Sequence, residues 1–158
     1  MKYVFDTNSL SNVLNHYYVE RFPTFWEKFN AKIQGGNLVS VREAKFELQG
    51  KFDNDAIEHL SKFNPDFFAD PTNEELEFIS EIYAITHFRQ NLDRKKLLQG
   101  GFFADPFIIA KARKTNDGAV VTEEEFKDHG AKIPNICRHF GIPCWTLEEF
   151  LEQENWRF

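Results

Sequence analysis

At 158 residues the chain is long enough for one compact domain and too short for two ordinary ones, so we predict a single domain over residues 1–158. The hydrophobic fraction of 42% and the 18 Phe argue against disorder. No apolar run approaches the roughly twenty residues of a membrane-spanning helix. The net charge of −6, from 19 Lys plus Arg against 25 Asp plus Glu, excludes a broad basic surface for nucleic acid. Any nucleic-acid substrate would have to meet a local basic patch.

We expect no targeting signal at the N-terminus. Met1 and Lys2 lead directly into an apolar stretch, without the charged, apolar and cleavage regions of a signal peptide, so we expect a cytoplasmic location. In such a reducing compartment Cys137 and Cys144 are expected to be thiols and not a disulfide.

The first predicted element is a buried strand over 3–5, a β-branched and aromatic run after which the chain turns polar. Asp6 stands where this strand ends, and ligands of open α/β sheets bind beyond the carboxyl ends of the strands. Asp6, Thr7 or Asn8 is also suited to cap a helix that begins near Ser9. Taken alone, this stretch favours a helix-capping role for Asp6 over a catalytic or ligand-binding one.

A strand-helix-strand pattern follows. Apolar residues keep helical spacing over 10–29, and Gly35-Gly36 ends that helix. Residues 37–41 are apolar enough for a second buried strand. The helix predicted after it carries Glu43 and Glu47 four residues apart, so both carboxylates lie on one face near the strand end.

The middle third, residues 52–100, lacks strand signals and is predicted to be a wholly helical insertion or lid against the sheet. Its basic residues are interpreted as a solvated helix end: Arg89, Arg94, Lys95 and Lys96.

The last third returns to alternating elements. Asp105 and Pro106 suit the N-cap and first turn of an apolar helix that must be buried. A strand over 118–122 ends in three consecutive acids, and an edge strand over 142–146 contains Pro143, which cannot donate to a central ladder. Strands that alternate with helices predict an α/β fold with a parallel sheet of about four strands.

Four acids follow predicted strands or begin a predicted buried helix: Asp6, Glu47 with Glu43 beside it, Asp105 and Glu124. In a parallel sheet these positions meet at one edge. Carboxylates at close quarters raise one another's pKa unless a cation neutralises them. Oxygen-only ligation selects Mg²⁺ or Mn²⁺ over zinc, and such a site suits phosphodiester hydrolysis. The residues are compatible with one bound ion or with two.

Each acid also has a purely structural explanation as a cap or a solvated face, and only their joint placement favours a site. A zinc site is rejected because the spacing of its candidates matches no zinc pattern: His129, Cys137, His139 and Cys144.

Taken together, these motifs resemble the PIN domain along nearly the whole chain, and more narrowly a subfamily of small PIN-like bacterial proteins. The resemblance rests on Val4-Phe5-Asp6-Thr7-Asn8, Glu47-Leu48, Ala104-Asp105 and Val120-Val121-Thr122 with an acid two residues beyond. It implies a three-layer α/β/α fold and a metal-dependent ribonuclease. Proteins of this kind are often the toxin of a type II toxin–antitoxin pair of the VapC kind, dimeric and silenced by a small antitoxin.

The resemblance also assigns roles by position. The metal ligands would be Asp6, Glu47, Asp105 and Glu124, with Glu43 as a substitute for Glu47. Partners that orient these carboxylates or water would be Thr7, Asn8 and Thr122. Glu124 departs from the usual Asp, so we weigh a second hypothesis, a degenerate PIN-like scaffold that binds RNA or a partner protein. Phosphatase chemistry with Asp6 as nucleophile is disfavoured because Asn8 stands where an acid is needed.

Basic residues that would guide an RNA backbone are predicted mainly on the helix that begins at Asp105. They are Lys111, Arg113 and Lys114, with Arg89 and Arg94 on the helical insertion.

Overall fold

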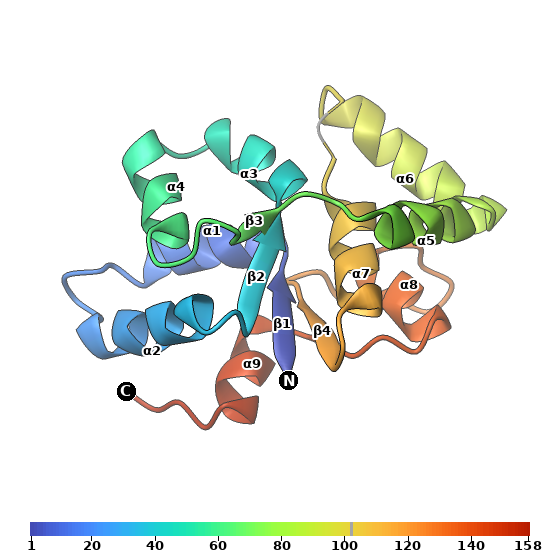
Figure 1. The fold of residues 1–158 in the computed structure, drawn as a ribbon. Helices are drawn as coiled ribbons and strands as arrows, with labels where there is room; N and C mark the ends of the chain where they lie inside the picture. Colours follow the sequence, from blue (N-terminus) through green and yellow to red (C-terminus); the bar gives the residue numbers. More distant parts are fainter. Residues whose placement is uncertain (102) are drawn as a thin grey trace.

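The computed structural model describes residues 1–101 and 103–158. Its centre is a parallel five-stranded sheet with the order β3-β2-β1-β4-β5 (Figure 1). The strands are β1 (Lys2–Phe5), β2 (Leu38–Val41), β3 (Phe68–Ala69), β4 (Gly118–Val121) and β5 (Cys144–Trp145). The α/β class and the parallel sheet predicted from the sequence are therefore confirmed, and the strand over 142–146 is an edge strand as predicted.

Helices connect successive strands, and one further helix follows the last strand. They are α1 (Thr7–His16), α2 (Pro23–Gln34), α3 (Arg42–Gln49), α4 (Asn54–Ser61), α5 (Asn73–Tyr83), α6 (Thr86–Leu98), α7 (Asp105–Lys114), α8 (Ile133–His139) and α9 (Leu147–Gln153). In the described part of the chain, none of these helices is long and apolar enough to cross a membrane. Both cysteines, Cys137 and Cys144, are free thiols.

The sheet separates two hydrophobic clusters, because successive side chains of a strand point to opposite faces. Val4 of β1 belongs to a cluster with residues of α5, α6, α7 and α8. Its neighbours Tyr3 and Phe5 belong to the other cluster, with residues of α1, α2, α4 and α9. Both groups of helices are visible on either side of β1 in Figure 1.

Two sequence-based expectations about the elements are wrong. The middle third is not wholly helical, because Phe68–Ala69 forms β3 on the outer side of β2, and Phe67 accepts a backbone hydrogen bond from Ser40 at 2.8 Å. The sheet therefore has five strands and not about four. The helix expected over 10–29 is two helices, since Pro23, which lacks a backbone N–H, starts α2 anew after α1 ends at His16.

The parallel register brings the ends of β1, β2 and β4 to one edge of the sheet. Phe5 pairs with Val121, and the N–H of Asp6 donates to the Val121 carbonyl at 3.0 Å. The buried Ser40 of β2 donates its hydroxyl to the Phe5 carbonyl at 2.7 Å. Residues that follow these strands are thus held side by side at the carboxyl edge, as the alternating pattern predicts.

At the opposite edge, Gly118 allows β4 to start directly against the end of α7. A Cβ at Gly118 would lie 2.3 Å from the Ala112 carbonyl oxygen, which is closer than real Cβ contacts. Gly118→Ala is therefore expected to lower the free energy of unfolding by about 1–3 kcal/mol, measured by urea denaturation.

Gly50→Ala is the matched control for this substitution. Gly50 has φ −78, and its added Cβ would meet the Glu47 carbonyl oxygen at an ordinary 3.5 Å. It should leave stability unchanged or raise it by up to about 1 kcal/mol. Equal effects of the two substitutions would contradict the proposed clash at Gly118.

Candidate functional site

Asp6 is fixed at the end of β1 by donors from two other segments. Its side chain is 3% exposed. Oδ1 accepts hydrogen bonds from the Ser9 backbone N–H at 2.8 Å and the Ser9 hydroxyl at 2.9 Å, and Oδ2 accepts from the Thr122 hydroxyl at 2.5 Å. Burial raises the pKa of Asp6 to about 7, against the lowering effect of these hydrogen bonds. Asp6 therefore caps α1, as the structural explanation proposed, and burial disfavours its charged form.

Glu47 of α3 joins two other elements. Its Oε1 accepts from the Thr7 hydroxyl at 2.9 Å and from the Ala104 backbone N–H, just before α7, at 3.1 Å. Burial raises the pKa of Glu47 to about 7, and the negative charge of Asp105 adds to the rise. Thr7, predicted to orient a carboxylate, thus contacts Glu47.

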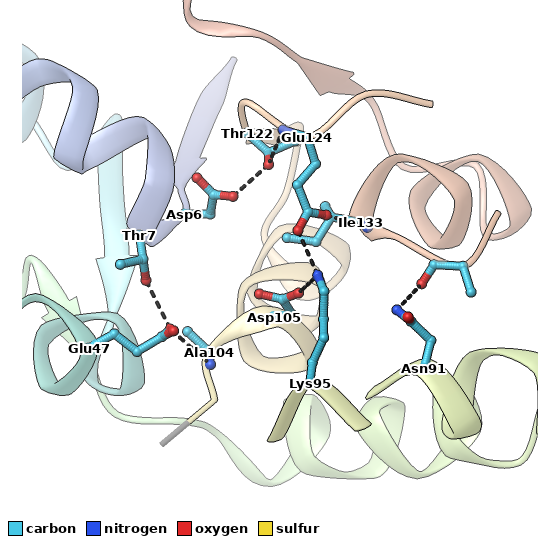
Figure 2. Close-up of polar contacts among 11 residues, drawn as sticks. Asp6, Thr7, Glu47, Asn91, Lys95, Ala104, Asp105, Thr122, Glu124 and Ile133 are labelled. Atoms are coloured by element: carbon cyan, nitrogen blue, oxygen red, sulfur yellow. Dashed lines mark hydrogen bonds and ion pairs between the residues drawn. The ribbon is translucent and has the colours of Figure 1, made fainter. Parts of the chain in front are cut away.

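A lysine joins the other two predicted acids. Lys95 of α6 places its ammonium nitrogen 2.8 Å from Asp105 Oδ2 and 2.6 Å from Glu124 Oε1 (Figure 2). Burial raises the pKa of Asp105 to about 6, although the charge of Lys95 opposes that rise. Burial alone would lower the pKa of Lys95, but the two carboxylates raise it, so the ammonium stays charged.

Glu124 reaches two elements with its side chain. Oε1 meets Lys95, while Oε2 accepts from the Ile133 backbone N–H at the start of α8 at 2.9 Å. The Glu124 backbone N–H donates to the Thr122 hydroxyl at 3.2 Å, which in turn donates to Asp6. Thr122 thereby links the first and last of the four acids.

All four predicted acids face one cavity of about 510 Å³. Its lining residues are Asp6, Thr7, Asn8, Phe46, Glu47, Gly50, Lys51, Lys95, Gln99, Asp105 and Glu124. Glu43, the predicted substitute for Glu47, is not part of this lining. Its Oε1 pairs with Arg42 at 3.2 Å, and its Oε2 is buried without a hydrogen-bond partner. Glu47 is therefore the acid of α3 that faces the cavity.

The donor set of this cavity fits Mg²⁺ or Mn²⁺ in its chemistry. Four carboxylates supply oxygen ligands, without sulfur or imidazole from the lining residues, and this combination selects a hard divalent cation over zinc. Burial raises the pKa values of Asp6, Glu47 and Asp105, and the proximity of other carboxylates adds to each rise. Over residues 1–101 and 103–158, no three His, Cys, Asp or Glu side chains are gathered as an ion's ligands. Lys95 holds two of the four carboxylates instead.

Sequence reasoning missed Lys95 and Ser9 as members of this site. Lys95 was expected in a solvated helix end, but its side chain is only 22% exposed. The helical spacing could have indicated this burial. Phe88, Leu92 and Lys95 lie on one face of α6, and the first two are buried. Ser9 carries no signal beyond its position three residues after Asp6, which suits a capping contact.

The predicted RNA-guiding residues of α7 lie away from this cavity, toward the helix end opposite Asp105. Lys111 pairs with the buried Glu75 at 3.8 Å, and both Arg113 and Lys114 stand over the Phe78 ring. Their role in binding nucleic acid stays a prediction.

The chain belongs to a family described as a domain of unknown function, DUF4411, whose model matches residues 3–158. No curated protein and no solved structure matches the chain.

The raised pKa of Asp6 makes the stability of the metal-free protein depend on pH. Between pH 3.8 and about 7, folded Asp6 keeps a proton that the unfolded chain releases, so its contribution to the free energy of unfolding falls as pH rises. Asp6→Asn removes this term while keeping an acceptor for Ser9. We expect the variant to be more stable than the parent by about 1–3 kcal/mol near pH 8.

The two proteins should differ little near pH 4, where Asp6 is protonated in the folded chain. Urea unfolding of both proteins in chelator, over a series of pH values, measures the difference. A constant difference across the series would contradict the assigned pKa shift.

Proposed function

We propose that this protein is a metal-dependent ribonuclease that hydrolyses phosphodiester bonds with Mg²⁺ or Mn²⁺. The observation that carries the proposal is that four carboxylates from separate segments face one cavity. Those carboxylates belong to Asp6, Glu47, Asp105 and Glu124. Burial and the neighbouring carboxylates raise the pKa values of three of them toward neutrality, and shifted carboxylates gathered in a cavity support a functional site.

A divalent ion bound by these carboxylates would activate water for attack on phosphorus and neutralise charge that develops on the phosphate oxygens. The chain's own residues prepare the site for that chemistry. Ser9 and Thr122 hold both oxygens of Asp6, and Thr7 holds Glu47, so these carboxylates keep one orientation without substrate. Lys95 adds a positive charge at the cavity that would attract the phosphate.

The sheet order and the helices against both faces are compatible with the PIN-like three-layer α/β/α fold that the sequence resembles. On that resemblance we propose that the protein is the toxin of a type II toxin–antitoxin pair, with RNA as substrate, a small antitoxin as partner and a homodimer as its assembly. A gene for a small DNA-binding protein beside its own would favour this role.

A second candidate function is a catalytically degenerate PIN-like scaffold that binds RNA or a partner protein. The observation that favours it is the pairing of Asp105 and Glu124 with Lys95, which already neutralises part of the acidic cluster. Calorimetric titration with Mn²⁺ separates the two candidates, because a scaffold has no need to bind the ion.

The ribonuclease proposal predicts that Asp105→Asn or Asp6→Asn reduces Mn²⁺-dependent cleavage of a fluorescent single-stranded RNA by about 100-fold or more. Loss of a residue that merely orients a metal ligand already costs roughly 10–100-fold. The measurement is the initial cleavage rate of the purified protein. Parent-like cleavage by both variants would overturn the assignment.

Asp70→Asn is the matched control for Asp105→Asn. Both aspartates stand in the sequence Ala-Asp-Pro, but the Asp70 side chain is 80% exposed and lies 3.8 Å from Arg42, outside the cavity lining. This control is expected to retain the parent rate. An equal loss in the two variants would mean that the effect does not arise in the cavity.

A further inference from the structure

Lys95 offers an inference that rests on the proposed function and concerns how many ions the site takes. Its ammonium nitrogen lies between Asp105 and Glu124, at 2.8 and 2.6 Å from one oxygen of each. Carboxylate oxygens are also the ligands that Mg²⁺ and Mn²⁺ prefer. The ammonium therefore occupies the place between these two acids that a second ion would need.

The helix that carries Lys95 is anchored, and the ammonium is held by its two ion pairs. His87 of α6 lies 3.1 Å through Nε2 from the carbonyl oxygens of both His129 and Gly130, and the Asn91 amide donates to the Ala131 carbonyl at 2.8 Å. Phe88 and Leu92 are also buried on the same helix. These contacts fix the backbone from which Lys95 reaches Asp105 and Glu124.

The two pairs of acids differ in what neutralises them. Asp105 and Glu124 share the Lys95 ammonium, whereas Asp6 accepts from neutral groups of Ser9 and Thr122. Glu47 accepts hydrogen bonds from the Thr7 hydroxyl and the Ala104 N–H, and the positively charged Lys51 lines the same cavity. A cation that enters the cavity thus gains most beside Asp6, whose hydrogen-bond donors are neutral.

We propose that Lys95 is a built-in cation that takes the place of a second divalent ion, so that the site binds one ion per chain. An ammonium carries three N–H donors, and two are directed at Asp105 and Glu124. Because Lys95 also lines the cavity, its third donor can meet a phosphate oxygen of the substrate there. The lysine then supplies, as a fixed charge, the electrostatic help that a second ion gives in two-metal nucleases.

The test is the number of Mn²⁺ ions bound, measured by isothermal calorimetry on the full chain. The parent is expected to bind one ion, and the neutral variants Lys95→Met and Lys95→Gln are expected to bind two, because Asp105 and Glu124 become available. Lys95→Arg keeps the charge and should still bind one ion. Lys96→Met, on the exposed neighbouring residue of α6, is the matched control and should also bind one.

Each other result has a definite meaning. Two ions in the parent would overturn the inference and leave the ribonuclease proposal standing. No ion in the parent would overturn both and favour the scaffold. If the parent and both neutral variants bind one ion, Lys95 does not exclude a second one and the inference is wrong. Lys95→Gln keeps hydrogen-bonding capacity toward the two acids, so the test stands if Lys95→Met fails to fold.

Discussion

The burial of the Asp6 carboxylate among hydrogen-bond donors is the constraint from which the site is built. A buried carboxylate is costly unless donors compensate it, and Ser9 and Thr122 supply them from α1 and from the end of β4. The Ser9 hydroxyl also lies 2.9 Å from the Val121 carbonyl, so the same residue secures β4. Thr122 continues the connection to Glu124, and Glu124 to Lys95. Asp6, Glu124 and Asp105 are therefore parts of one hydrogen-bonded network at the carboxyl edge of the sheet.

Much of this arrangement could be predicted because it follows from short-range patterns and one rule of topology. Apolar runs that end in an acid mark β1 and β4, and parallel strands bring their carboxyl ends together. Those two facts suffice to place Asp6 and Glu124 at one edge. Asp105 could be predicted as a site residue because it is a charged residue at the start of an apolar, buried helix.

The features that the sequence did not reveal depend on contacts between distant segments. The strand β3 has two residues, too few for any periodicity, and exists because it covers the outer side of β2. The choice between Glu43 and Glu47 depends on the rotation of α3 against the sheet, which their shared helical face leaves open. Lys95 was misread because a cluster of basic residues usually lies in solvent, and its burial depends on acids that are 10 and 29 residues away.

The anchoring of α6 has a consequence for how related chains diverge. Its acceptors at His129, Gly130 and Ala131 are main-chain carbonyls, which every amino acid provides, whereas its donors are the particular side chains of His87 and Asn91. Substitutions can thus accumulate in the loop before α8 while the helix opposite must retain its polar residues. Among related chains, the side chains of His87 and Asn91 should therefore vary less than the residues whose carbonyls they contact.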